Sequence, residues 1–196
     1  MKTLLLTHAK ENAIYQSLTK LPDGSIFIDQ QIRTLRQLGF EPYVILDETN
    51  AEEILRQSKE LEDCEIIYDT VEKPNVCTNL QAGLFAVQRF CFALPITTPA
   101  PPKGVWNQLS RVFFHHGDRI DRDIIQTFYS AFGSILPGYP LLITPRGCRR
   151  IKSFDIFNSL NDKRIQIHPT AVLRLCSLDL LDPHSTKPLT IVNSNQ

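Results

Sequence analysis

The apolar positions in the first half of the chain follow two alternating patterns. Short continuous apolar runs, typical of buried strands, occur at "KTLLL", "PYVILD", "CEIIYD" and "CFALPI". Between them, helical spacing of apolar residues predicts helices in "IFIDQQIRTLRQLGF", "AEEILRQSKEL" and "TNLQAGLFAVQRF". Gly39 marks the expected end of the first helix, and Asn50 is the expected N-cap of the second. Strands that alternate with helices of about 10–15 residues indicate parallel βαβ units.

The second half of the chain is less regular. The proline-rich "TTPAPPKGVWNQL" predicts a loop and a short helix, and "DRDIIQTFYSAF" predicts another helix. Strands are expected in "YPLLIT", in "AVLRLCSL" and in the tail "PLTIVNSNQ". Because no long Gly/Ser linker interrupts the chain, we expect one domain, residues 1–196. The predicted fold is α/β, a Rossmann-like three-layer α/β/α sandwich with a mostly parallel sheet.

Composition and charge narrow the classes of partner. The 21 basic residues balance the 21 acidic ones, which disfavours a nucleic acid or a membrane held by bulk charge. The apolar runs are shorter than a signal-peptide core and than the roughly 18–20 residues of a membrane span. The five cysteines are odd in number and lack CxxC spacing, so neither a disulfide framework nor a zinc site is indicated. We expect a soluble, cytoplasmic protein.

The loop after the first strand is the first candidate for chemistry, because open parallel sheets bind ligands beyond the carboxyl ends of their strands. The backbone N–H groups of Thr7, His8 and Ala9 can contact a phosphate whose charge Lys20 neutralises. The alternative is an ordinary βα connection with a surface lysine. Physical reasoning alone favours the ordinary connection, since no glycine precedes Gly24 to let the backbone approach a phosphate closely.

Other polar groups offer weaker candidates. The adjacent residues His115 and His116 point to different sides and lack metal-ligand spacing, so we expect a surface or partly buried pair. The cysteines lie in or beside apolar segments, which favours buried structural roles, and "RGCRR" indicates a solvated turn. Asp47 and Asp69 follow the second and third strands, whereas the fourth strand ends in "LPITTP" without an acid.

Five segments, in their order along the chain, carry a resemblance to a known family. They are "LLLTHAKENAIYQSLTKLPDGSIFIDQQIRTLRQLGF", "NVCTNLQAGLFAV", "ALPITTPAPPKGVWNQL", "GYPLLITPRG" and "LTIVNSNQ". Together they resemble the nucleotidyltransferase family that includes the molybdenum-cofactor guanylyl- and cytidylyltransferases. The likeness covers most of the chain, and the order of the segments is its most specific feature. It implies the nucleotide-diphospho-sugar transferase type of fold.

The resemblance also implies a nucleotide site. Lys20 falls at the signature lysine and is the implied catalytic residue, which stabilises charge on the phosphates. Asn79 and Gly83 match the helix that borders the base. The nucleotide-binding residues implied in this way are Leu6, Thr7, His8, Ala9, Lys20, Asn79 and Gly83.

The departures from the family pattern all affect chemistry. Ala9 replaces a loop glycine, and no arginine stands between Ala9 and Lys20. Thr97 occupies the place of the metal-binding aspartate, and Asn193 takes a later aspartate or asparagine position. No metal ligand is therefore assigned, and Mg²⁺ is the expected cofactor only if the protein is active.

Three functions follow as hypotheses. The first is a nucleotidyltransferase-like protein whose ancestral reaction transfers NMP from an NTP to a phosphorylated acceptor, with catalysis weakened or lost. The second is a non-catalytic ligand-binding or regulatory protein on the same fold. Thr97 favours this second hypothesis, whereas Lys20 and "NLQAGL" favour the enzyme. A sugar-nucleotide glycosyltransferase would need a DxD-like pair, and its nearest candidate, "DRIDRD", falls at the start of an expected helix. The expected partner is a nucleotide or another small phosphorylated ligand, and the oligomeric state is not predicted.

Overall fold

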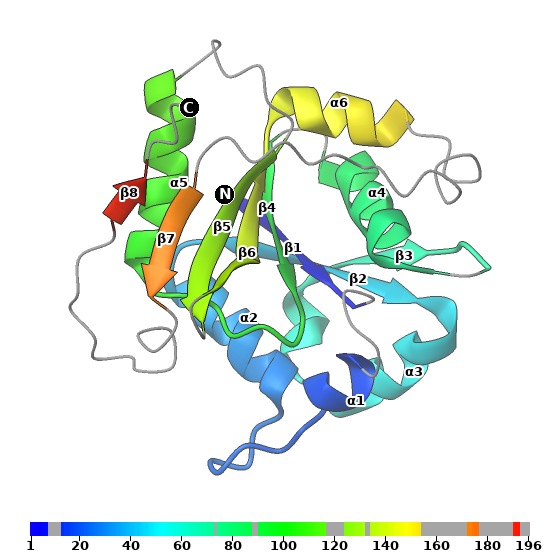
Figure 1. Cartoon of the computed structure of the whole chain (residues 1–196). Coiled ribbons are helices and arrows are strands. Elements are labelled where there is room, and N and C mark those ends of the chain that lie inside the picture. Colours follow the sequence, from blue (N-terminus) through cyan, green and yellow to red (C-terminus); the bar gives the residue numbers. More distant parts are fainter. Residues whose placement is uncertain are drawn as a thin grey trace.

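One mixed sheet runs through the part of the chain that the computed structural model describes (Figure 1). The described residues are 1–7, 13–72, 74–87, 90–116, 124–131, 134–153, 172–176 and 190–192. Their eight strands lie in the order β3-β2-β1-β4-β6-β5-β7-β8. The strands are β1 (Lys2–Leu6), β2 (Glu41–Asp47), β3 (Glu65–Asp69), β4 (Cys91–Pro95), β5 (Ile124–Ala131), β6 (Ser134–Ile143), β7 (Val172–Cys176) and β8 (Thr190–Val192). The helices are α1 (Ala13–Ser17), α2 (Phe27–Gln37), α3 (Glu48–Gln57), the 3-10 turn η1 (Glu60–Asp63), α4 (Val76–Val87), α5 (Lys103–His116) and α6 (Pro145–Ser153).

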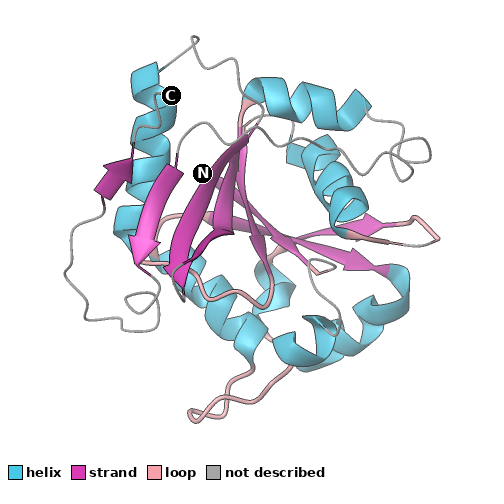
Figure 2. Cartoon of the chain, viewed as in Figure 1, coloured by secondary structure: helices cyan, strands magenta, loops and turns pink. Residues whose placement is uncertain are grey.

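The first four strands are parallel, which confirms the α/β prediction. β1 pairs with β2 on one side and with β4 on the other, so that Leu6 lies opposite both Ile45 and Pro95. The apolar side chains of these strands point alternately to the two faces of the sheet. Both faces are covered by helices, which explains why β1, β2 and β4 are continuous apolar runs rather than alternating ones (Figure 2).

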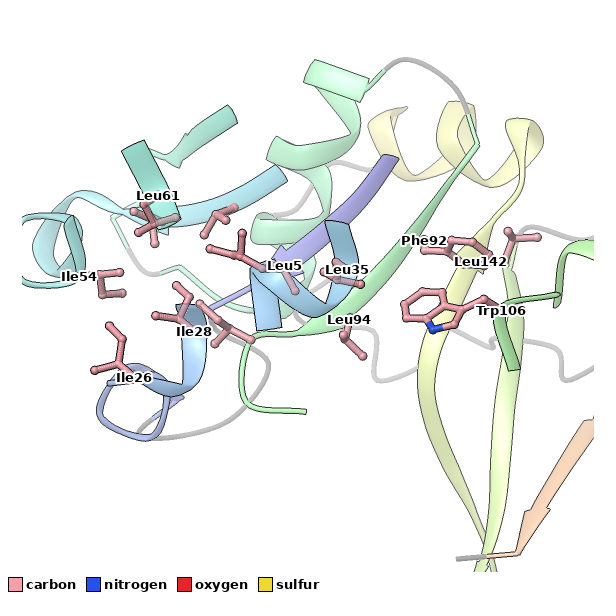
Figure 3. Close-up of a cluster of buried hydrophobic side chains, with 14 of the residues drawn as sticks. Leu5, Ile26, Ile28, Leu35, Ile54, Leu61, Phe92, Leu94, Trp106 and Leu142 are labelled. Carbon is pink, nitrogen blue, oxygen red and sulfur yellow. The ribbon is translucent and has the colours of Figure 1, made fainter. Parts of the chain in front are cut away.

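Two apolar clusters fix the helices on the sheet. On one face, Ile28 of α2, Ile54 of α3 and Trp106 of α5 join Phe92 and Leu94 of β4 in one buried cluster (Figure 3). On the other face, α4 and α6 pack through a second cluster that includes Leu84, Cys148 and residues of β1 and β2. The result is the predicted three-layer arrangement. In the described residues, no helix is both long and apolar enough to cross a membrane.

The helix boundaries confirm one prediction and correct another. Gly39 follows α2 with a φ of +83° and donates its N–H to Arg36 O, as expected of a glycine that ends a helix. Asn50 was expected to cap the second helix, but it lies inside α3, so that prediction was wrong. α3 begins at Glu48, directly after β2, with a carboxylate in its first turn where the helix dipole favours one.

Two elements of the second half differ from the predictions. The segment expected to be helical contains the strand β5, which pairs antiparallel with β6. Ile124, Ile125 and Thr127 are β-branched, and the pairing with β6 decides their conformation. The expected turn at "RGCRR" is part of α6, which starts at Pro145, and Gly147 N donates to the Thr144 hydroxyl at 3.1 Å. The strands expected in "YPLLIT", "AVLRLCSL" and the tail are confirmed as β6, β7 and β8.

Candidate functional site

The strand order places a topological switch point at the ends of β1 and β4. From β1 the chain moves outward to β2 and β3, and it then crosses back to β4 on the other side of β1. In open α/β sheets the connections diverge at such a switch point, and ligands bind there beyond the carboxyl ends of the strands. Ile96 N donates to Leu6 O at 2.9 Å, which ties the two strand ends together. The first residues beyond this tie are Thr7 and Thr97.

Thr7 is held by a buried hydrogen-bond network. Its backbone N–H donates to Asn79 Oδ1 at 3.0 Å, and its hydroxyl donates to Ile45 O at 2.8 Å. Asn79 Nδ2 in turn donates to Asp69 Oδ2 at 2.7 Å. The network therefore joins the ends of β1, β2 and β3 to the first turns of α4. It fixes the start of the loop that follows β1.

Asp69 is the centre of this network. Its Oδ2 also accepts the Thr78 hydroxyl at 2.5 Å, and its Oδ1 accepts the Val71 N–H at 3.2 Å. Asn75 Oδ1 accepts the backbone N–H groups of Cys77 and Thr78, as a helix N-cap does. A carboxylate at the start of α4 is also favoured by the helix dipole. Asp69 is thus an anchor for α4, with protein donors on both of its oxygens.

The loop after β4 is held from α2. The buried Gln31 accepts Ala100 N–H at 2.8 Å and donates to Thr98 O, so its amide bridges the loop backbone. Thr98 N also donates to Pro95 O at 2.9 Å. Within this fixed loop, the buried Thr97 hydroxyl has no hydrogen-bond partner among the described residues. A buried polar group without a partner costs about 1–3 kcal/mol. Its place at the switch point makes this hydroxyl a candidate for contact with a ligand.

The residues implied by the resemblance are placed unevenly. Leu6 and Thr7 are buried at the end of β1, and Asn79 is fully buried on α4. Lys20 is exposed and pairs with Ile26 in an isolated antiparallel bridge just before α2. The structure brings Thr7 and Asn79 into contact. His8, Ala9 and Asn193 lie outside the described residues.

Gly83 has a packing role on α4. A Cβ added there would lie 2.8 Å from Leu4 Cδ1 and 3.2 Å from Ile45 Cδ1. The missing side chain therefore lets α4 approach β1 and β2 closely. The roles of Gly83, Asn79 and Lys20 in nucleotide binding stay predictions.

The described donors do not fit a tightly held divalent ion. They include no group of three or more His, Cys, Asp or Glu side chains. Asp69 lies three strands away from β4, roughly 14 Å at about 4.8 Å per strand, so it and Thr97 cannot share an ion that needs ligands at about 2.1 Å. Asp47, at the end of β2, is buried and already has a bonding partner.

Comparison with known proteins adds a fold-level likeness. No protein-family profile and no curated protein sequence matches the chain. A 2-C-methyl-D-erythritol 4-phosphate cytidylyltransferase from Francisella tularensis has a TM-score of 0.62 at 13% identity, over 92% of this chain and 96% of that one. Rv0371c from Mycobacterium tuberculosis has a TM-score of 0.60 at 14% identity, over 89% and 87% of the two chains. The chain shares the fold of these proteins.

A third structure is consistent with this likeness. The 4-diphosphocytidyl-2C-methyl-D-erythritol synthase from Anaerococcus prevotii has a TM-score of 0.57 at 10% identity, over 86% of this chain and 78% of that one. Rv0371c has also been crystallised in complex with manganese. The Rossmann-like, nucleotidyltransferase type of fold expected from the sequence is therefore confirmed.

Two sets of contacts at the carboxyl ends of the strands were not expected from the sequence: those of Asp69 with Asn79, and those of Gln31 with the loop after β4. Asp69 and Asn79 were each noticed, but their contact across nine intervening residues was not expected. Gln31 lies one turn from Ile28 and Leu35 on the apolar face of α2, and a polar residue on that face was the available signal. Sequence periodicity shows that Gln31 faces inward but not which loop it meets.

Proposed function

We propose that the chain is a nucleotidyltransferase-like protein that binds a nucleotide beyond the carboxyl ends of β1 and β4. In this proposal, its ability to transfer NMP from an NTP to a phosphorylated acceptor is weakened or lost. The observation that carries the proposal is the buried hydroxyl of Thr97, which has no hydrogen-bond partner among the described residues and lies at the switch point of a cytidylyltransferase-like fold. That hydroxyl is suited to a ligand oxygen, and it supplies no charge.

The phosphates are assigned to the loop after β1. The bond from Thr7 N to Asn79 Oδ1 supports this assignment, because it fixes the backbone at the entry to the loop that continues through His8 and Ala9. Lys20 is exposed, so its ammonium is available to neutralise phosphate charge without first breaking an internal contact. Asn79 then acts by positioning Thr7, and Leu6 and Gly83 act by fixing the strand and helix beside it.

Weak catalysis follows from the donor set. Nucleotidyl transfer usually relies on a divalent ion held by one or two carboxylates. Thr97 offers a neutral oxygen in the place where the resembling family carries an aspartate, and Asp69 is bound within the scaffold. We therefore assign no catalytic step to Mg²⁺ in the native chain. A role like that of the molybdenum-cofactor enzymes is the finest level of the resemblance and remains a hypothesis.

The test is nucleotide binding, measured by thermal shift and by calorimetry with the four NTPs, each with and without Mg²⁺. Saturation at a hundred times Kd adds about 2.7 kcal/mol of stability, which raises Tm by roughly 5–10 °C for a chain of this size. If no NTP or NMP shifts Tm at millimolar concentration, the binding proposal is wrong. Robust Mg²⁺-dependent release of pyrophosphate by the native chain would overturn the loss of catalysis while leaving the binding site in place.

A gain-of-function variant sharpens the test. Thr97→Asp places a carboxylate at the end of β4, and it should tighten NTP binding about tenfold in the presence of Mg²⁺ only. Thr98→Asp adds the same charge one residue further along the same loop and serves as the matched control. If both variants tighten NTP binding equally, any added negative charge in this loop is sufficient. Thr97 would then have no specific place in the proposed site.

A further inference from the structure

Asn79 and Gly83, the two residues of α4 that the resemblance matches to the base, are both committed to packing. Asn79 is fully buried, and its amide is bonded to Thr7 and Asp69. Gly83 has no side chain, and a Cβ added there would meet the side chain of Leu4. The proposed function gives both residues a positioning role. The residue that contacts the base is therefore still to be assigned.

Tyr139 of β6 lies at the same end of the sheet as the proposed nucleotide site. β6 runs antiparallel to β4, and their pairing ends at Ala93 and Leu141. Because the two strands are antiparallel, Tyr139 lies beyond this pair in the direction of Pro95, the carboxyl end of β4. Tyr139 is half-buried and packs against both apolar clusters, one on each face of the sheet. Its side chain is thus anchored without being fully enclosed.

A bulge in β6 separates Tyr139 from the regular pairing of that strand. The register with β5 shifts between Gln126 and Thr127. Tyr139 and Pro140 are the two extra residues on β6, and neither has a partner residue on β5. The Thr127 hydroxyl donates to Pro140 O at 3.4 Å and holds the bulge against β5. Bulges are common next to binding sites, where they change the direction of a side chain.

The first turn of α4 lies on the other side of the switch point. β1 and β4 lie between β3, from which the chain enters α4, and β6, which carries Tyr139. Val76 and Cys77 are exposed in this turn, and the exposure of Cys77 contradicts the expectation that every cysteine is buried. Burial raises the pKa of the Tyr139 phenol, and the Cys77 thiol raises it further, so the two side chains are close enough to interact electrostatically. α4 carries no charged residue from Val76 to Val87.

We propose, on the basis of the proposed function, that Tyr139 stacks on the base of the bound nucleotide, with Val76 and Cys77 on the opposite side of the base. An aromatic ring can stack on any base, because every base has a π-face. Val76 has no polar side-chain atom, and a thiol is only a weak hydrogen-bond donor. The site therefore recognises a nucleotide by its ring system and its phosphates. The substrate class is nucleotides of any base, and the four NTPs should bind within about tenfold of one another.

The test compares binding of ATP and of inorganic tripolyphosphate to the full chain by calorimetry. Tyr139→Leu should weaken ATP binding about tenfold or more, because the stacking contact is lost. Tripolyphosphate has no base, so its binding should not change. Tyr139→Phe keeps the ring and should bind ATP as the native chain does. The matched control is Tyr68→Leu on β3, which removes an exposed tyrosine and should change neither affinity.

A spectroscopic measurement provides a second readout that needs no disruptive variant. The chain has five tyrosines, so ¹³C labelling of the tyrosine rings gives few NMR signals. Those of Tyr139 are the ones lost in Tyr139→Phe. Saturating ATP should shift them through the ring current of the adenine, whereas tripolyphosphate should not. If Tyr139→Leu fails to fold, this measurement still decides.

Failure of this inference and failure of the proposed function give different results. If the native chain binds no NTP, the proposed function is wrong and the inference is wrong with it. If the native chain binds ATP, but Tyr139→Leu binds it equally well or the Tyr139 signals do not move, then Tyr139 is not the base contact and the proposed function stands. One NTP bound about a hundredfold more tightly than the other three would show base-specific hydrogen bonds and would overturn recognition by stacking.

Discussion

The carboxyl ends of β3 and β4 lie in the same sheet but differ in how their polar groups are satisfied. At β3, Asp69 accepts hydrogen bonds from Thr78, Asn79 and Val71, and the network continues to Thr7. At β4, Gln31 holds the backbone of the loop, yet the buried hydroxyl of Thr97 has no hydrogen-bond partner among the described residues. The hydrogen bonds of Asp69 and Asn79 hold α4 against the ends of β1 and β3. The loop after β4 is also held by hydrogen bonds, and it leaves the Thr97 hydroxyl for the ligand contact that we propose.

The largest expected effect removes the centre of the satisfied network. Asp69→Ala should lower the free energy of unfolding by about 3 kcal/mol, because the buried hydroxyl of Thr78 and the buried amide of Asn79 both lose their hydrogen-bond acceptor. Urea denaturation measures this change. The control Asp63→Ala removes an exposed carboxylate and should change stability by less than about 0.5 kcal/mol. A loss at Asp69 no larger than that at Asp63 would contradict the scaffold role.

The next effect tests how closely α4 is fixed to the sheet. Gly83→Ala should destabilise the protein by about 2 kcal/mol, because the new methyl group overlaps the side chain of Leu4. The matched control is Gly104→Ala on α5, where the added methyl meets nothing within 4 Å, so helix propensity should stabilise that variant by up to about 1 kcal/mol. Thermal or urea unfolding should show that Gly83→Ala lowers the free energy of unfolding, whereas Gly104→Ala raises it. A neutral Gly83→Ala would show that Leu4 can move aside.

The smallest expected effect on stability tests most directly the difference between the carboxyl ends of β3 and β4. Thr→Val is nearly isosteric, so it removes a hydroxyl with little change of shape. Thr7→Val should cost about 1 kcal/mol, since it leaves Ile45 O without its donor. Thr97→Val should instead stabilise the free protein by about 1 kcal/mol and weaken nucleotide binding. A destabilised Thr97→Val would mean that its hydroxyl has a partner and that the contrast between the edges is wrong.

The sequence predicts the parallel half well because local pattern and tertiary burial agree there. Ile28, Ile32 and Leu35 mark the buried face of α2, and the run Leu4 to Leu6 is buried on both faces of β1. In the second half the two signals conflict. The segment 124–131 is a strand because it pairs with β6, a contact that no local window reveals. The helix α6 was missed because a basic run hides the Pro145 start and the buried Cys148.

The candidate site was predictable only as a location. Candidates were expected beyond the carboxyl ends of the strands. The bond from Ile96 N to Leu6 O shows that the ends of β1 and β4 lie side by side. The sequence does not show that Asn79 faces Thr7 and Asp69 rather than a base, because α4 places polar residues on more than one side. Gln31 shows the same limit, since its partners Thr98 and Ala100 are set by how α2 docks on the sheet.

The strand order also has a consequence for synthesis on the ribosome. β1 is made early, but one of its two neighbours, β4, begins at Cys91, 85 residues after Leu6 (91 − 6). At about 5–20 residues per second, the edge of β1 that faces β4 stays unpaired for roughly 4–17 s. An exposed strand edge made of Leu4, Leu5 and Leu6 can pair with another nascent chain. For several seconds, each newly made chain can therefore aggregate through this strand edge. A chaperone that covers the edge, or a low local concentration of other nascent chains, favours folding over aggregation.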